Sequence, residues 1–224
     1  RFSDLMKELN KVNGIERYRI SSIEPNLITE DVIEIVKEST KFMPHFHIPL
    51  QSGSDTILKK MRRKYKTKLY REKIQSIHNS IQDVCIGADV IVGFPGESNK
   101  EFNETLKFIK ALPISYLHLF PYSARENTLA SDFENQVENK VKAERSRQLI
   151  ILSQKIRNDF YQRYINTEHT VLFEQKNNQG MLYGFTDNYI KVKIPFREEL
   201  CQLKTQVSLL AIDKDGIMKA SLIK

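Results

Sequence analysis

Polar and turn-forming residues follow each of four apolar β-strand candidates in this 224-residue chain. In parallel sheets and barrels of alternating strands and helices, ligand-binding residues lie at the carboxyl ends of the strands and in the following loops. Hydroxyl, amide and carboxylate groups there could bind ribose hydroxyls or an amino acid carboxylate, and glycines let a ligand approach the backbone. Any one edge could be an ordinary turn, but the four together favour a binding site. The edges carry Ser22, Glu24 and Pro25; Gln51, Ser52 and Gly53; Gly93, Pro95, Gly96 and Glu97; and Phe120, Pro121, Tyr122 and Ser123.

One carboxylate and two histidines lie inside strand candidates. Asp89 interrupts the apolar stretch 86–94, and a buried carboxylate needs a partner, so we expect it either to pair with Arg63 or to contact a ligand. His45 and His47 are two residues apart and share one face of a strand. A metal site needs a third ligand, which the sequence does not offer nearby, so a structural role is favoured for this pair. His78, His118 and His169 are isolated and are predicted to be structural or solvated.

Composition limits the classes of protein that the chain can represent. The two cysteines, Cys85 and Cys201, provide neither a disulfide framework nor a metal-binding CxxC motif. No apolar run approaches the roughly 20 residues needed to cross a membrane, and residues 1–12 resemble a short amphipathic helix rather than a signal peptide. We therefore expect a cytoplasmic protein with no membrane partner. The net charge of +7 and the pI near 9.2 suit a polyanionic partner such as nucleic acid.

The elements that carry these edges follow a repeating pattern. Amphipathic helix patterns separate or follow the strand candidates, with apolar residues three and four apart. Such alternation predicts a parallel sheet with covering helices. Helix starts are expected at Thr29, at Ser54 and at Ser98, where Glu101 completes a capping box. The strand candidates are 18–23, 45–50, 86–94 and 115–120, and the helix candidates are 29–40, 54–62, 67–82 and 98–111.

A different pattern begins after a long helix predicted over 135–164. Short β-rich runs are separated by turn residues at 177–180, 187–188 and 214–216, which is typical of a small antiparallel β-barrel. We place the boundary near residue 165, so that 1–165 and 166–224 form two domains. The fold class is therefore α/β, with a parallel βα unit followed by a small barrel. The runs are TVLFEQ, GMLYGFT, NYIKVKIP, QVSLLAID and MKASLI.

Three motifs in a fixed order carry a family resemblance. HIPLQSGSDTILKKMRRKY (47–65), GADVIVGFPGES (87–98) and LHLFPYSARENTLA (117–130) resemble the radical S-adenosylmethionine (SAM) tRNA methylthiotransferases. The resemblance implies a partial TIM-like radical SAM barrel over 1–165 and a TRAM domain, a small RNA-binding barrel, over 166–224. The stretch RISSIEP (19–25) resembles the branch that acts on N6-threonylcarbamoyladenosine beside the anticodon of tRNA. The implied activity is 2-methylthiolation of that nucleoside, and the isopentenyladenosine branch remains an alternative.

The resemblance also implies cofactors. The family uses SAM and two 4Fe-4S clusters, of which a CxxxCxxC loop holds one. None of those cysteines is present here, and iron ligation needs thiolates. We interpret the chain as one that begins partway through the barrel, lacks its first strands and is inactive alone. An exposed barrel edge of this kind predicts pairing with another chain or aggregation.

Site residues follow from the same resemblance. In the tail, aromatic and basic side chains are mixed as an RNA surface requires, and an RNA-binding module without catalysis is a further alternative. The basic run 59–66 could contact phosphate or could be a solvated helix end. The sequence carries no signature of the sulfur donor, the electron donor or an oligomeric state. The residues expected near SAM are Ser22, Glu24, Gln51, Arg63 and Asp89 for ribose and the amino acid part, and Val92, Gly93, Phe94, Phe120 and Tyr122 for adenine; those expected near RNA are Tyr183, Phe185, Tyr189, Lys191, Lys193 and Arg197.

Overall fold

The first part of the chain contains a four-stranded parallel sheet. The structure is a computed structural model that describes residues 1–126, 128–178 and 180–223, and the side chains of these residues except 175–178. The strands pair in the order β1-β2-β3-β4, each parallel to its neighbour. All four predicted strands are confirmed, although the first is shorter and the second begins earlier than expected. Their bounds are β1 (Tyr18–Ile20), β2 (Phe42–His47), β3 (Cys85–Val92) and β4 (Tyr116–Pro121).

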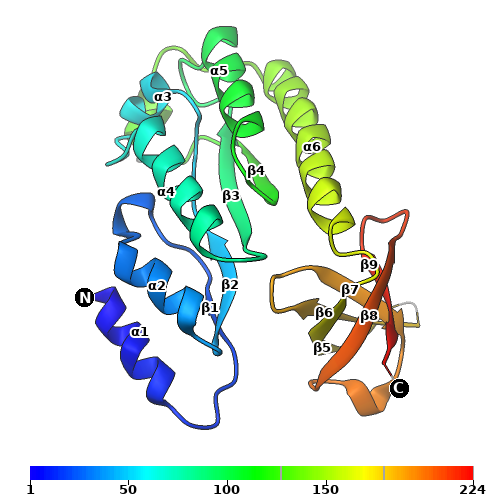
Figure 1. Cartoon of the computed structure of the whole chain (residues 1–224). Helices are drawn as coiled ribbons and strands as arrows, with labels where there is room; N and C mark the ends of the chain where they lie inside the picture. The colour runs from blue at the N-terminus through cyan, green and yellow to red at the C-terminus, as the bar shows by residue number, and fades with distance from the viewer. Residues whose placement is uncertain (127, 179, 224) are drawn as a thin grey trace.

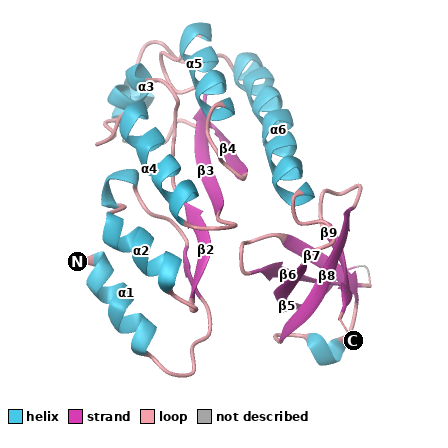
Figure 2. Cartoon of the chain, viewed as in Figure 1, coloured by secondary structure: helices cyan, strands magenta, loops and turns pink. Residues whose placement is uncertain are grey.

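Helices cover one face of this sheet, as Figure 2 shows. Alternate β3 residues such as Ala88 and Val90 are fully buried in the core that this packing creates. The Thr29 side chain caps α2 by accepting a hydrogen bond from the Val32 N–H, and Ser98 and Glu101 form the predicted capping box of α5. The helices are α1 (Phe2–Lys11), α2 (Glu30–Glu38), α3 (Asp55–Lys60), α4 (Thr67–Ser80) and α5 (Asn99–Lys110), with short 3-10 turns at Pro25–Leu27, Leu129–Asp132 and Glu198–Leu200.

The long helix α6 (Asn139–Gln162) packs along β4 and leads to the second part of the chain (Figure 1). It confirms the helix predicted over 135–164, with a later start. Its last turns carry Phe160 and Tyr161, which are buried in the core of the second part together with Tyr164. The chain reaches β5 through residues 163–167, which include the predicted domain boundary. No helix in the described ranges is long and apolar enough to cross a membrane.

The second part is a closed five-stranded barrel in the order β5-β6-β7-β9-β8. The prediction of an antiparallel barrel is wrong for one pair, because β7 and β9 run parallel. Five strands cannot alternate in direction all the way around a closed barrel, so at least one pair must be parallel. One predicted turn, 177–180, includes residue 179, which lies outside the described residues. The strands are β5 (Glu168–Asn178), β6 (Met181–Thr186), β7 (Lys191–Pro195), β8 (Lys204–Ile212) and β9 (Met218–Leu222).

Candidate SAM-binding site

A cavity of about 500 Å³ lies where β3 and β4 end and the segment after β2 passes them. Cavities of this size accommodate ligands as large as a nucleoside derivative. Four of the side chains expected near SAM contribute to its wall: Gln51, Asp89, Phe120 and Tyr122. Ser123, Arg125 and Thr128 add polar groups to the same wall. The structure therefore brings together residues from two of the four strand edges with Asp89 from within β3.

Backbone hydrogen bonds fix Gln51 at this edge. Its φ of 65° lies in the left-handed region, which is unusual for a residue with a side chain. The Gln51 N–H donates to the Asp89 carbonyl at 2.8 Å, and the Gln51 carbonyl accepts from the Ile91 N–H at 2.9 Å. The segment after β2 is thus tied to β3, and Gln51 is held next to Asp89.

Asp89 is paired with His47 rather than with Arg63. The His47 Nε2 lies 2.8 Å from an Asp89 carboxylate oxygen, and its Nδ1 lies 3.1 Å from the Ser21 carbonyl. Both partners are acceptors, so each of these hydrogen bonds needs a proton on the ring nitrogen that forms it. The expectation of an Asp89–Arg63 pair is wrong because β2 is the direct neighbour of β3 and brings His47 closer.

Three other residues expected near SAM lie outside the wall of this cavity. Arg63 forms an ion pair with Glu24 at 3.1 Å, and its buried Nε has no partner within the described part of the chain. Ser22 is exposed in the segment after β1. Glu24 of the first strand edge therefore pairs with Arg63 outside the wall of the cavity.

The expected adenine segment forms a layer behind the cavity. Val92 and Phe94 are buried, and the Phe94 ring meets the Tyr122 ring edge to face at 5.3 Å between centroids. Gly93 has a φ of +72°, and the aliphatic part of Lys142 covers its Cα, so that a Cβ has no room there. The role of these residues in contacting adenine stays a prediction.

Glu97 of the third strand edge forms a buried ion pair whose arginine partner was not predicted. Arg145 of α6 donates from Nη1 to the Glu97 carboxylate at 2.7 Å, and the Gly93 N–H donates to the same carboxylate oxygen at 3.0 Å. Burial raises the pKa of Glu97, against the effect of both hydrogen bonds. The sequence held one signal, because Arg145 occupies an apolar position of its helix, four residues before the buried Leu149.

The two strand histidines contact other side chains of the described structure. His45 stacks on Tyr189 of the small barrel at 4.1 Å between ring centroids, and its Nε2 lies 2.8 Å from the Tyr116 hydroxyl. Among the residues that the structure describes, no three histidine, cysteine, aspartate or glutamate side chains gather around one point. His45 therefore packs against aromatic side chains in the joint between the sheet and the small barrel.

Acidification is expected to lower the free energy of unfolding through His45, because burial lowers the pKa of its ring from 6.5 to about 3. The unfolded chain takes up the proton first. The stability that neutral His45 contributes is therefore complete above pH 6.5 and is lost as the pH falls toward about 3. We expect the free energy of unfolding, measured with urea, to fall between pH 7 and pH 5 by about 1–2 kcal/mol more in the wild-type chain than in His45→Gln. Equal losses in the two proteins would contradict this assignment.

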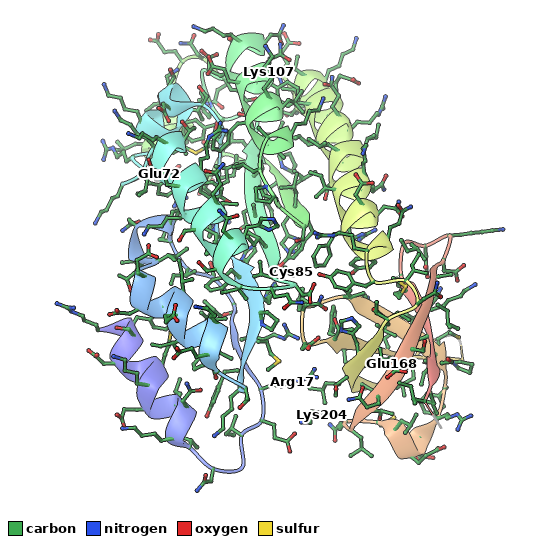
Figure 3. The ribbon with its side chains drawn as sticks, in the orientation of Figure 1. Arg17, Glu72, Cys85, Lys107, Glu168 and Lys204 are labelled. Carbon is green, nitrogen blue, oxygen red and sulfur yellow. The ribbon has the colours of Figure 1, made fainter. Side chains whose placement is uncertain are left out.

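The joint between the sheet and the small barrel uses several residues that were expected to bind RNA. Tyr189 also stacks on Phe185 at 4.7 Å, and the Arg19 guanidinium lies 4.9 Å from the Tyr189 ring centroid. Arg17 and Arg19 donate to backbone carbonyls of the small barrel. Figure 3 shows Arg17 and Cys85 on the side of the sheet that faces the barrel.

The other expected RNA-binding residues divide into two groups. Lys193 is buried and pairs with Asp213 and Asp215, each at 2.6 Å. Tyr183 and Lys191 are half-buried neighbours, with the ammonium group 5.4 Å from the ring centroid, and Arg197 is exposed. Only this second group is placed to meet an RNA ligand from solvent, and its binding role stays a prediction.

The described residues fit SAM but do not fit an iron–sulfur cluster. Aromatic rings and a few polar side chains line the cavity, and the Tyr122 hydroxyl is buried with no hydrogen-bond partner in the described part of the chain. The two cysteines are both free, and Cys85 is buried in the joint, where burial raises the pKa of its thiol to about 12. Such a thiol does not supply the thiolate that a cluster needs.

Comparisons with known proteins agree with this architecture. A family model described as the Radical SAM superfamily matches residues 1–109. The solved structure of coproporphyrinogen III oxidase (HemN) from Escherichia coli, a radical SAM enzyme, superposes with a TM-score of 0.56 at 17% sequence identity, over 69% of this chain and 36% of that one. That likeness concerns the fold alone. Residues 1–109 are thus similar to the Radical SAM superfamily, a family that generally implies SAM and 4Fe-4S clusters.

Curated relatives define the subgroup more closely. Threonylcarbamoyladenosine tRNA methylthiotransferase MtaB of Bacillus subtilis (strain 168) is 41% identical over 214 residues, which cover 93% of this chain and 48% of that protein. tRNA-2-methylthio-N(6)-dimethylallyladenosine synthase of Clostridium tetani (strain Massachusetts / E88) is 40% identical over 188 residues, or 83% of this chain and 42% of that protein. The chain spans about half the length of these relatives. The matches support an MtaB-like family member.

Proposed function

We propose that this chain is part of a tRNA methylthiotransferase that converts N6-threonylcarbamoyladenosine next to the anticodon to its 2-methylthio derivative. The observation that carries the proposal is the cavity at the strand ends, where Gln51, Asp89, Phe120 and Tyr122 converge in a chain with MtaB-type relatives. When bound there, SAM supplies the radical and the methyl group of the reaction. Residues 1–165 form the catalytic part, and residues 166–224 form a TRAM domain that binds tRNA in the cytoplasm.

The roles of this chain's own residues follow from the geometry. Asp89, oriented by His47, accepts hydrogen bonds from ribose hydroxyls, and Gln51 offers an amide beside it. Phe120 and Tyr122 contact the adenine ring and exclude water, as aromatic side chains commonly do in nucleotide sites. Two 4Fe-4S clusters are held by cysteines of the whole protein that lie outside this chain. The 224 residues alone are therefore inactive.

Reconstitution of the full-length protein tests the substrate. The reduced, cluster-loaded enzyme and SAM are incubated with tRNA that carries either threonylcarbamoyladenosine or isopentenyladenosine, and the nucleosides are measured by mass spectrometry. We expect the 2-methylthio product from the first tRNA only. Product from the second alone would favour the isopentenyladenosine branch, to which several relatives of similar identity belong by name. tRNA binding without product from either would favour a binding module.

A further inference from the structure

A second concavity of about 500 Å³ lies between α6 and the turn that joins β8 to β9. Figure 1 shows this turn beside the last turns of α6. The helix contributes Gln154, Arg157 and Asn158, and the turn contributes Lys214 and Gly216. We name this concavity the α6–turn notch. The functional site described above uses none of its residues.

The turn is held rigidly by its own hydrogen bonds. The Gly216 N–H donates to the Asp213 carbonyl at 2.8 Å, and the Ile217 N–H donates to an Asp215 carboxylate oxygen at 3.1 Å. Gly216 has a φ of +74°, and a Cβ placed on it would lie 2.6 Å from the Arg157 Nη2. The guanidinium therefore lies directly against the glycine, where a larger residue would displace it.

The carboxylates of the turn are already neutralised by lysines of the barrel. Lys193 pairs with both Asp213 and Asp215 at 2.6 Å, and Lys219 pairs with Asp213 at 3.0 Å. Hydrogen bonding to Lys193 holds the pKa of Asp213 well below its usual range. These acids are engaged elsewhere, and none forms an ion pair with Arg157 or with the Lys214 ammonium in the described structure.

Four donor-bearing side chains of the notch remain available. Within the described part of the chain, Arg157, Gln154, Asn158 and the Lys214 ammonium form no hydrogen bond or ion pair with another residue. The fifth donor-bearing side chain, Lys155, pairs with Asp159 at 2.6 Å. Two unpaired cations beside two free amides, facing one concavity, form a site whose chemistry suits a singly charged oxyanion.

We infer that the α6–turn notch binds a phosphate of the RNA backbone, with Arg157 as the main contact and Lys214 as the second. This inference rests on the proposed function, because it assigns an additional contact to the same tRNA. Arg157 presents two donors in a plane, the geometry that suits a phosphodiester. Ile151, which is 60% exposed at the rim, offers an apolar surface to the neighbouring sugar or base. The tRNA then contacts the linking helix as well as the small barrel.

The salt dependence of tRNA binding tests the inference on the whole 224-residue chain. Each phosphate contact releases counterions, so losing one lowers the slope of log K against log salt by roughly 0.7–0.9. We expect Arg157→Ala to lower the slope by about that amount and to weaken binding about tenfold, whereas Arg157→Lys retains most of the slope. Lys107→Ala is the matched control, because it removes one exposed charge from α5 at the far end of the molecule (Figure 3).

The outcomes separate this inference from the proposed function. An unchanged slope in Arg157→Ala, while the wild-type chain binds tRNA, would overturn the notch assignment and leave the proposed function standing. No tRNA binding by the wild-type chain would contradict both. A parallel titration with inorganic phosphate distinguishes a site for free anions: if Arg157→Ala abolishes phosphate binding but leaves the RNA slope unchanged, the inference also fails. Melting curves of both Arg157 variants establish that they are folded.

Discussion

Replacing Arg145 with methionine is expected to lower the free energy of unfolding by about 3–5 kcal/mol, because the change leaves a buried carboxylate unpaired. The Arg145 and Glu97 side chains are only 6% and 2% exposed, respectively, and their Nη1 and Oε1 atoms lie 2.7 Å apart. Arg145 also donates to the Glu97 carbonyl at 3.0 Å and to Asn99 at 3.0 Å. Urea unfolding monitored by circular dichroism measures the loss.

Two controls distinguish a buried pair from a general effect of charge. Arg147→Met removes an arginine two residues away, whose side chain is 75% exposed. We expect the free energy of unfolding to change by less than about 0.5 kcal/mol. The double variant Arg145→Met, Glu97→Gln should recover much of the loss, because it removes both charges together. A double variant as unstable as Arg145→Met alone would mean that Arg145 contributes through packing rather than through its pairing with Glu97.

Replacing Asp89 with alanine in the full-length enzyme is expected to weaken SAM binding by about 10- to 150-fold, the range for losing one hydrogen bond to a charged group. Asp89 faces the cavity, and His47 holds its carboxylate at 2.8 Å. Equilibrium dialysis with labelled SAM measures the change. His47→Gln keeps a hydrogen-bond donor but loses the ring. It should weaken SAM binding less than Asp89→Ala does.

A matched control is Asp31→Ala, which removes an exposed carboxylate from the first turn of α2. It should leave SAM affinity unchanged. Equal affinities of the wild-type, Asp89→Ala and Asp31→Ala proteins would place the SAM site elsewhere in the molecule.

The sequence predicted the elements well, because their signals are local. The capping box at Ser98 and the apolar spacing of the helices depend on residues a few positions apart. The strand edges were likewise identified from the polar residues that follow each apolar run. Such patterns need no knowledge of which strand lies beside which.

The pairings that complete the site could not be predicted in the same way. His47 meets Asp89 only because β2 and β3 pair with His47 opposite Gly87, and this register is not written in either strand alone. Arg145 reaches Glu97 across 48 residues of chain. Tyr189 and Phe185 have the composition of an RNA surface, yet they pack in the joint, because aromatic side chains suit both roles.

The most direct test of the proposed function is mass spectrometry of tRNA nucleosides from cells with and without the intact gene. The account predicts that deletion removes 2-methylthio-threonylcarbamoyladenosine and that the precursor without the methylthio group accumulates. Reintroducing the wild-type gene should restore the product. Unchanged levels of 2-methylthio-threonylcarbamoyladenosine in the deletion strain would contradict the account.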